Sequence, residues 1–307
     1  MSRSFVVAAA QMGPVQVDEP RSSAVRRMID LLEEGAARGA SLVAFPEAAL
    51  TAFFPHWFIE DERELWGWFE ESMPNAAVAP LFERAYELGV AFSFGYGELV
   101  RETDRVRQFN TSVLVDRDGG IVGRYRKIHL PGFREVQPGH AFENLEKRYF
   151  EVGDQGFRTW DLLGGRVGLC ICNDRRWPET FRVLGLQGVE LVLTGYNTPY
   201  HNPAMPETDR LAGFHNHLSM QAGAYQNGTW VVGVAKAGVE AGVHQIGGSC
   251  IIAPSGEIVA LARTEQDEVV TATVDLDACT SYKTQMFNFA AHRRPEHYGA
   301  ITEPASE

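Results

Sequence analysis

The sequence lacks an excess of positive charge. Lysine and arginine number 28 against 40 aspartate and glutamate residues, which gives the 307-residue chain a formal net charge of −12. Proteins that bind nucleic acid by neutralising phosphates, or that bind anionic membrane surfaces, carry basic clusters. We therefore expect neither nucleic acid nor a membrane as a partner. An anionic substrate would have to be held by locally placed arginine or lysine side chains.

Long apolar runs are also missing. No segment has the roughly 20 consecutive apolar residues that a membrane-spanning helix requires. The N-terminal apolar run Phe5–Ala10 is too short for the core of a signal peptide. The sequence therefore predicts a protein that is not exported and stays in the cytoplasm.

Cysteine is scarce, and no two cysteines form a C-x-x-C pair. The four are Cys170, Cys172, Cys250 and Cys279. Zinc ribbons and thioredoxin-type redox sites therefore have no support, and free thiols in a reducing compartment are expected. His215 and His217 lie two apart in a helical segment, where side chains point to different faces. We expect no metal site, and no P-loop or dinucleotide-binding glycine motif is present.

What the sequence does contain is a regular alternation of short apolar runs and amphipathic segments. Such alternation predicts an α/β fold with covered sheets. The expected strands are residues 5–11, 41–45, 90–94, 110–115, 121–125, 166–172, 190–194, 229–235, 248–254, 257–262 and 268–275. The expected helices are residues 22–38, with Ser22 or Ser23 as N-cap, and residues 76–88, 178–186 and 205–227.

Two similar hairpins, Leu114–Val122 and Ile252–Val259, indicate two related halves. No proline- or serine-rich linker separates these halves, so we interpret residues 1–307 as a single domain. The segment after residue 275 is polar but contains aromatic side chains. We expect this C-terminal tail, residues 276–307, to dock on a neighbouring subunit.

The segment around Cys172 is the most informative in the chain. A strand ends at this cysteine and a helix begins near Pro178, so the thiol lies at the exit of a sheet, where side chains become accessible. The backbone N–H of Asn173 could donate to a developing oxyanion, and Arg175 and Arg176 are near enough to favour a thiolate. However, strand-end cysteines serve packing more often than catalysis, and the two arginines could equally pair with surface carboxylates.

A cysteine nucleophile needs a proton acceptor. None of the nine histidines lies in a sequence context typical of cysteine proteases. Glu47 directly follows the strand that ends at Pro46 and is itself followed by apolar residues, so its carboxyl would be partly desolvated, which suits a general base. The simpler alternative for this glutamate is a helix cap or a salt bridge in a loop.

Two further charged residues could take part. Lys127 lies just after the first hairpin and would stabilise negative charge on a tetrahedral intermediate, although a lysine in such a run is more often solvated surface. Glu146 lies in a charged cluster that would ordinarily form a solvated face. Residue type alone does not decide between these interpretations.

Three segments together resemble the nitrilase superfamily, the carbon–nitrogen hydrolases with a Glu–Lys–Cys triad. The matching segments are Phe45–Glu47, Tyr125–Leu130 and Ile171–Glu179. The likeness extends to N-carbamoyl-D-amino acid amidohydrolases, through segments spread over nearly the whole chain. These are Phe53–Pro55, Leu145–Phe150, Gly195–Pro199, Ser219–Gly223 and the tail from Phe287 to Gly299.

The resemblance implies a four-layer αββα sandwich, no metal or organic cofactor, and a homodimer or homotetramer. The catalytic positions that it implies are Cys172 as nucleophile, Glu47 as general base, Lys127 as oxyanion stabiliser and Glu146 as a supporting glutamate. The substrate-lining positions that it implies are His129, Asn173, Arg175, Arg176 and Asn197. The chain departs from related carbamoylases in Phe133–Ala141 and at Asn144, where they have histidine, so we expect Asn144 at the substrate with an altered side-chain preference.

The implied reaction is hydrolysis of an N-carbamoyl-D-amino acid to the D-amino acid, CO2 and ammonia through a cysteine acyl-enzyme. The carboxylate of such a substrate needs a cation, which Arg175 and Arg176 can supply as a fork. Two alternatives stay open. One is another amidase or a β-ureidopropionase of the same superfamily, and the other is a catalytically silent binding or scaffold protein with this fold. An intact set of Glu, Lys and Cys favours an enzyme.

Overall fold

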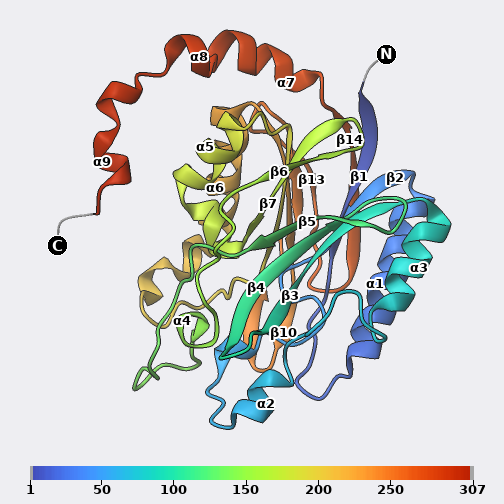
Figure 1. Ribbon diagram of the computed structural model, residues 1–307, viewed down its shortest axis with the longest axis vertical. Coiled ribbons are helices and arrows are strands. Elements are labelled where there is room, and N and C mark those ends of the chain that lie inside the picture. Colours follow the sequence, from blue (N-terminus) through green and yellow to red (C-terminus); the bar gives the residue numbers. More distant parts are fainter. Residues whose placement is uncertain (1–2, 305–307) are drawn as a thin grey trace.

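Two six-stranded β-sheets pack face to face in the computed structural model, which describes residues 3–304 (Figure 1). In spatial order the first sheet contains β14 (Glu268–Asp275), β1 (Ser4–Gln11), β2 (Ala40–Ala44), β3 (Ala91–Arg101), β4 (Val106–Val115) and β5 (Ile121–Arg126). The second contains β13 (Ile258–Leu261), β12 (Cys250–Ile252), β9 (Trp230–Ala235), β8 (Leu191–Tyr196), β7 (Gly165–Ile171) and β6 (Thr159–Leu162).

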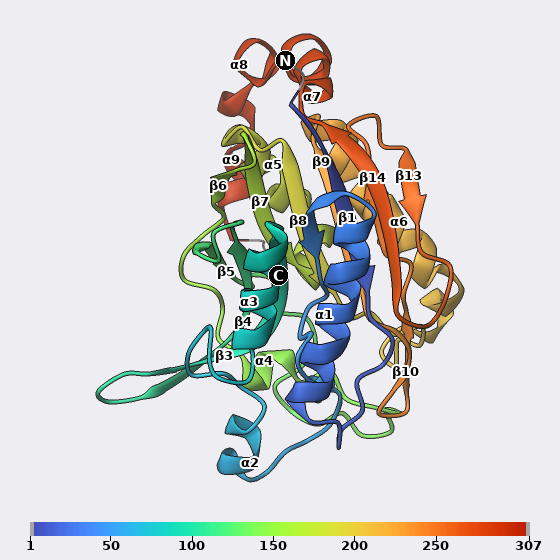
Figure 2. The same ribbon diagram turned by 90° about the vertical axis from the view of Figure 1, so that its right-hand side faces the viewer.

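Helices cover the outer face of each sheet. They are α1 (Arg21–Ala37) and α3 (Ala79–Leu88) on the first sheet, and α5 (Pro178–Leu186) and α6 (Ala212–Asn227) on the second. Figure 2 shows α1 and α3 on the opposite side of the sheets from α6. The predicted α/β class and the four-layer αββα sandwich are therefore confirmed.

Both faces of the central strands are buried, which explains their nearly continuous apolar sequence. In β1, Val7 and Ala9 belong to the core shared by the two sheets, whereas Ala8 and Ala10 pack with side chains of α1. The alternation follows from the two-residue period of a strand. The small alanine side chains let α1 lie close, because a Cβ added to Gly35 of this helix would be 3.3 Å from the Ala8 Cβ.

Strand direction determines where the site lies. Strands β1, β2 and β3 are parallel, as are β7, β8 and β9. Strand β5 runs in the same direction as β3 because both are antiparallel to β4. The carboxyl ends of β2 and β5 are therefore at one edge of the first sheet, and the end of β7 faces them from the second sheet.

Most expected elements form within two residues of their predicted bounds. Helix α5 and strand β14 match at both ends, and the expected hairpins are β4–β5 and β12–β13. The predicted N-cap of α1 is wrong, because the helix begins at Arg21 after Pro20 and places Ser22 and Ser23 inside its first turn. Segment 205–227 contains the 3-10 helix η3 (Pro206–Leu211) before α6.

Several short elements were not predicted. They include η1 (Phe54–His56), α2 (Glu62–Trp66), β6, and the hairpin of β10 (Ala237–Glu240) and β11 (Val243–Ile246). Strand β11 bonds to the segment that follows β8: Ile246 N donates to Thr198 O at 2.9 Å, and Tyr200 N donates to His244 O at 2.8 Å. The hairpin therefore supports a segment that becomes a cavity wall.

The C-terminal tail leaves the sandwich after β14. It forms α7 (Ala278–Ser281), the π-helical turn η4 (Tyr282–Met286), α8 (Phe289–His292), η5 (Pro295–His297) and α9 (Gly299–Thr302). Figure 1 shows the tail arching past α5 and α6. It contacts both helices, because the Arg182 guanidinium lies 4.3 Å from the Phe289 ring centroid and the Tyr225 ring meets Phe287 edge to face at 5.1 Å. The Met286 and Ile301 side chains on the tail are exposed. Docking of the tail on a partner subunit and the single-domain interpretation both stay predictions.

The helices of residues 3–304 include none with the length and apolar content to cross a bilayer. The cytoplasmic location stays a prediction.

Candidate active site

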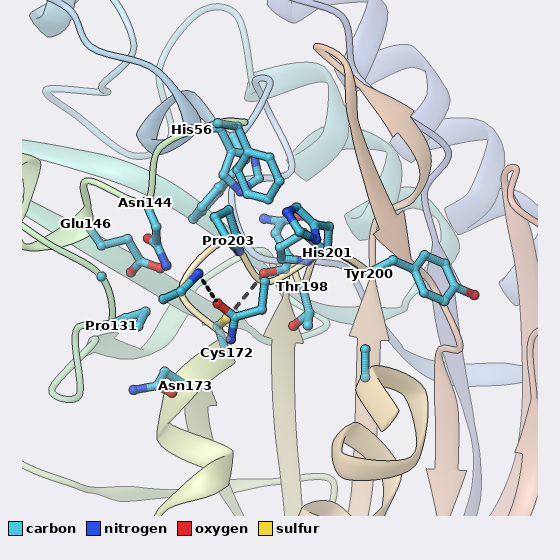
Figure 3. A pocket seen from close by; sticks show the side chains of 18 of the residues that line it. His56, Pro131, Asn144, Glu146, Cys172, Asn173, Thr198, Tyr200, His201 and Pro203 are labelled. Atoms are coloured by element: carbon cyan, nitrogen blue, oxygen red, sulfur yellow. Dashed lines mark hydrogen bonds between the residues drawn. The ribbon is translucent and has the colours of Figure 1, made fainter. Parts of the chain in front are cut away.

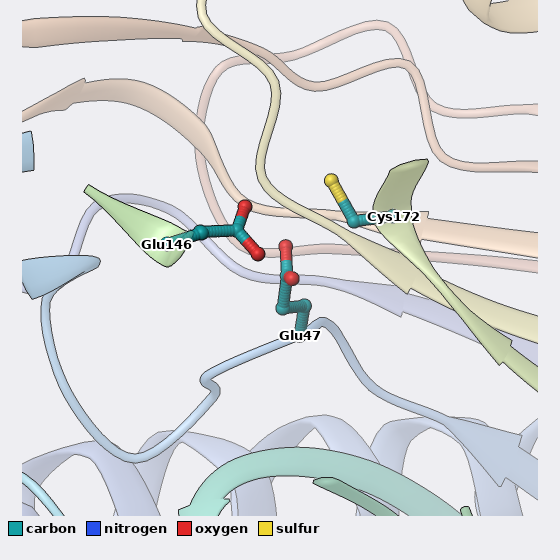
Figure 4. A group of neighbouring side chains, drawn as sticks. All are labelled: Glu47, Glu146 and Cys172. Carbon is teal, nitrogen blue, oxygen red and sulfur yellow. The ribbon is translucent and has the colours of Figure 1, made fainter. Parts of the chain in front are cut away.

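Four sequence-predicted residues come together between the two sheets. Glu47 follows β2, Lys127 follows β5, Cys172 follows β7, and Glu146 begins α4 (Glu146–Tyr149). All four are buried, with exposed fractions between 0% and 6%. One carboxylate oxygen of each glutamate and the Cys172 sulfur lie within 4.8 Å of one another (Figure 4). Acid, base and thiol chemistry can therefore act on the same bound atom.

Lys127 supplies the positive charge of this group. Its Nζ donates to Glu47 Oε1 at 2.9 Å and to Glu146 Oε2 at 2.6 Å. Burial lowers the pKa of Lys127, but its acidic neighbours Cys172, Glu146 and Glu47 together outweigh burial and raise it above its ordinary value. The lysine is therefore a fixed ammonium group throughout the neutral range.

Glu47 is oriented by donors from both sheets. Its Oε1 accepts a hydrogen bond from Asn110 Nδ2 at 2.7 Å, and its Oε2 accepts one from the Asn197 backbone N–H at 2.8 Å. The Asn197 side chain donates in turn to the Glu47 carbonyl at 2.9 Å. Asn110 was not predicted as a site residue, because nothing in its local sequence marks it.

The backbone at Glu47 also lies against a glycine from each sheet. A Cβ added to Gly95 of β3 would lie 2.7 Å from the Glu47 Cα, and one added to Gly195 of β8 would lie 2.4 Å from the Glu47 N. The next residue, Ala48, has a φ of 46°, which only a well-fixed backbone sustains in a residue with a side chain. The close approach of Gly95 and Gly195 therefore leaves the Glu47 backbone little room to move.

Cys172 lies at the junction of β7 and the 3-10 helix η2 (Cys172–Arg176), with a φ of 46°. Burial and the charge of Glu47 raise the pKa of its thiol, and they outweigh the opposite effects of Lys127 and Arg175. Arg175 does favour the thiolate, as predicted, but its effect does not bring the pKa of the thiol below its ordinary value. The resting thiol keeps its proton and needs a neighbouring base to remove it.

Glu146 differs from an ordinary surface glutamate in its protonation. Burial raises its pKa to about 7, although the Lys127 ammonium lowers it, and the nearby Glu47 carboxylate adds to the increase. Glu146 therefore titrates in the neutral range, where most glutamates are fully ionised.

A cavity of about 290 Å³ reaches Cys172 (Figure 3). The predicted substrate residues that line it are Asn144, Asn173, Arg176 and Asn197, together with Glu146 and Cys172. Lining residues that the sequence analysis missed include Phe53, His56, His140, Phe142, Thr198, Tyr200, His201 and His215. Most of these residues lie in irregular segments, where no periodic pattern marks them. Phe53, His56 and Thr198 could have been predicted, because they lie within or beside segments that carry the family resemblance.

Arg175 does not line this cavity. It is 1% exposed, and its guanidinium donates to Asn216 Oδ1 at 2.9 and 2.7 Å and to Thr198 Oγ1 at 2.9 Å. It also lies 4.3 Å from the ring centroid of Tyr196. Because its donors are used inside the protein, the predicted two-arginine fork is wrong, and only Arg176 of the pair faces the cavity.

His129 also lies outside the cavity that reaches Cys172. Its Nδ1 is 2.8 Å from Asp174 Oδ1, and its ring stacks on Trp177 with a centroid distance of 5.0 Å. It lines a neighbouring cavity, which Asn173 borders as well. Asp174, a fully buried residue that was not predicted, also accepts from the Tyr125 hydroxyl at 2.8 Å, so His129 is held by a structural network.

The two histidines of the H-x-H segment face different surroundings, as their helical spacing predicts. His215 lines the cavity, whereas His217 Nε2 lies 2.9 Å from the Gly248 carbonyl. They do not form a common ligand pair.

The two glutamates and Cys172 are close enough to ligate one metal ion. However, the Lys127 ammonium already bonds both carboxylates and would repel a second cation there. The expectation of no metal and no cofactor stays a prediction.

Comparison with known proteins agrees with this geometry. A family model described as carbon-nitrogen hydrolase matches residues 6–284. The chain is 30% identical over 284 residues to N-carbamoylputrescine amidase of Arabidopsis thaliana, covering 88% of this chain and 87% of that protein. It is 30% identical over 295 residues to a nitrilase of Pyrococcus abyssi, covering 95% and 98%. A solved carbon-nitrogen hydrolase of Helicobacter pylori has the same fold, with a TM-score of 0.84, 22% identity and 99% of both chains covered.

Proposed function

Because this chain belongs to the carbon–nitrogen hydrolase family, we propose that it hydrolyses N-carbamoyl-D-amino acids to the D-amino acid, CO2 and ammonia. The family gives the class of reaction, which is cleavage of a carbon–nitrogen bond in an amide or carbamoyl compound. The carboxylate-bearing substrate is supported by one observation, a cation at the cavity without a carboxylate partner.

That cation is Arg176, which lines the cavity together with Cys172. Arg176 is exposed to solvent at the cavity. Within residues 3–304, no carboxylate forms an ion pair with its guanidinium, and desolvation by the surrounding protein and the neighbouring Arg175 lower its pKa. A bound carboxylate would offset both effects by a charge-assisted hydrogen bond. In a chain with a net charge of −12, an arginine without an acidic partner beside the thiol favours an anionic substrate.

The reaction begins with transfer of the thiol proton from Cys172 to Glu47. The sulfur then attacks the ureido carbon, and the C=O electron pair moves onto oxygen. The Lys127 ammonium and the Asn173 N–H stabilise this oxyanion, and one such donor contributes about 3–4 kcal/mol to lowering the barrier. When the tetrahedral intermediate collapses, the C–N bond breaks and Glu47 returns the proton to the departing nitrogen.

Water completes the reaction. Glu47 removes a proton from a water molecule, which attacks the carbonyl carbon bonded to sulfur. The C–S bond then breaks, Glu47 returns the proton to the departing sulfur, and the released carbamic acid decomposes to CO2 and the remaining amine or ammonia. Glu146 keeps Lys127 in place through its 2.6 Å hydrogen bond and thereby supports both halves of the reaction.

The carbamoyl group of the proposed substrate has two supports. One relative is named N-carbamoylputrescine amidase, after a substrate with this group. In addition, Asn197 Oδ1 is buried at the cavity without a hydrogen-bond donor among the described residues, so it can accept from a ureido N–H. The preference for the D-enantiomer rests on the resemblance to D-carbamoylases.

The test compares N-carbamoyl-D-alanine, its L-enantiomer and ethylurea, which lacks the carboxylate. We expect turnover of the D-compound, which Cys172→Ala abolishes. Arg176→Met should raise KM for the D-compound about 10- to 100-fold, the loss expected for a hydrogen bond to a charged group, with no change for ethylurea. Arg166→Met is the matched control, since Arg166 is half-exposed on β7 and pairs with Asp161.

The other outcomes identify the alternatives. Preference for the L-compound, for N-carbamoyl-β-alanine or for a simple amide would replace the proposal by a different carbamoylase, a β-ureidopropionase or an amidase. Activity retained by Cys172→Ala would contradict the mechanism. A folded chain without turnover of any ureide, amide or nitrile would favour the silent scaffold.

A further inference from the structure

A second buried ion pair lies outside the residues that carry the proposed chemistry. Lys236 follows β9 and Glu240 ends β10, and their exposed fractions are 0% and 1%. Lys236 Nζ lies 2.9 and 2.8 Å from the two carboxylate oxygens of Glu240. Desolvating two charges costs much of what their attraction contributes, so stability alone is a weak reason for this pair.

Both members of the pair hold the same short stretch of backbone. Lys236 Nζ donates to the Thr51 carbonyl at 2.7 Å, and Glu240 Oε1 accepts from the Phe53 N–H at 2.7 Å. Glu240 Oε2 accepts from the Val15 N–H at 2.9 Å. The pair thus connects the β9–β10 region to residues 51–53. These residues belong to no helix or strand, so no regular backbone hydrogen bonding holds them in place.

The stretch held in this way forms part of the cavity wall. The Phe53 side chain lines the cavity, and its ring meets that of His56 edge to face at 4.8 Å. His56, seen at the cavity in Figure 3, meets Phe142 in the same manner at 5.1 Å. Burial and the charge of Lys236 lower the pKa of His56 to about 3, so this wall is uncharged at neutral pH.

We propose that Lys236 and Glu240 are positioning residues that fix the Phe53–His56 wall, and thereby set the fit of the substrate rather than the chemical step. The catalytic end of the same loop is held separately. Asn197 Nδ2 donates to the Glu47 carbonyl, and Ala49 N donates to the Gly95 carbonyl at 2.9 Å. Loss of the ion pair therefore releases the wall while Glu47 keeps its anchors.

The inference rests on the proposed function only through the substrate used to measure it. The test is the double variant Lys236→Met/Glu240→Leu, which removes both buried charges together and leaves neither one unpaired. We expect KM to rise about 10-fold or more while kcat stays within about threefold of wild type, the pattern of lost ground-state binding. The matched control is Arg3→Met/Glu190→Gln, which removes an ion pair of 2.8 Å beside the N-terminal end of β7, and it should change neither constant.

A second variant and a second readout keep the test decisive. Glu240→Asp preserves the charge balance but shortens the reach to the Phe53 and Val15 amides, so it should raise KM in the same direction if the double variant does not fold. A crystal structure of either variant should show the Phe53 backbone displaced. A folded variant with wild-type KM, or with Phe53 in its original place, overturns the inference. Failure of wild type on every carbamoyl substrate contradicts the proposed function, and the position of Phe53 then decides the inference by itself.

Discussion

Two lysines are buried equally in this molecule, yet their pKa values shift in opposite directions. Lys127 and Lys236 are both 0% exposed. Burial lowers the pKa of each, but Lys127 faces a thiol and two carboxylates and its pKa rises, whereas Lys236 faces Glu240 and its pKa falls. Burial therefore does not identify a catalytic lysine. What distinguishes Lys127 is its position, since it bonds two carboxylates that lie within 4.8 Å of the Cys172 sulfur.

The largest expected effect comes from removing each lysine in turn. Lys127→Met should lower kcat by about 10²–10³-fold, because the oxyanion loses a buried donor. Lys236→Met leaves the buried Glu240 carboxylate unpaired, so it should lower the free energy of unfolding by roughly 3–5 kcal/mol. It should leave kcat within about threefold of wild type. Steady-state kinetics and urea unfolding of the two variants measure both quantities. Equal losses of kcat would mean that the surroundings of a buried lysine do not set its role.

A glycine substitution tests whether close approach fixes the Glu47 end of the loop. In Gly195→Ala the new methyl group would meet the Glu47 backbone nitrogen, and displacement of a catalytic group by about 1 Å can cost about 10²-fold in rate. We expect a loss of kcat of that order. Gly213→Ala is the control, because its Cβ would meet nothing within 4 Å. Wild-type kcat in Gly195→Ala would contradict the argument.

The smallest effect is a pH dependence of stability. The pKa of Glu146 rises from 4.5 to about 7 on folding, so the folded state binds more protons than the unfolded state between these values. Stability should therefore fall as pH rises from about 4.5 to 7, and level off above 7. Glu146→Gln removes this titration. The free energy of unfolding of wild type, relative to that of Glu146→Gln, should therefore fall by roughly 1–3 kcal/mol as the pH rises through this range. Urea unfolding from pH 5 to 8 measures it, and a constant difference would contradict the assignment.

Much of the fold and the centre of the site could be predicted from the sequence. Strand ends are local features, so the positions of Glu47, Lys127 and Cys172 at strand exits followed from apolar runs and the turns after them. Their convergence required the resemblance to a family, because no local pattern tells which strand ends face each other.

Other features depend on the direction of single side chains, which sequence order does not reveal. Arg175 and Arg176 are adjacent, but consecutive residues of a 3-10 turn point to different sides, so one is buried against Asn216 and the other faces the cavity. Asn110 and Glu240 contact the site region from strands distant in sequence, and their roles arise only from tertiary packing.

The floor and the walls of the cavity at Cys172 are built from different types of structure. The floor is made by side chains at the ends of packed strands, whereas the walls are irregular segments around Phe53, residues 131–144 and residues 198–212. Loops tolerate exchange far better than strands do. Engineering of this hydrolase for a bulkier or differently charged substrate should therefore exchange the loop segments that line the cavity. The Lys236–Glu240 ion pair should be kept whenever the segment around Phe53 is exchanged.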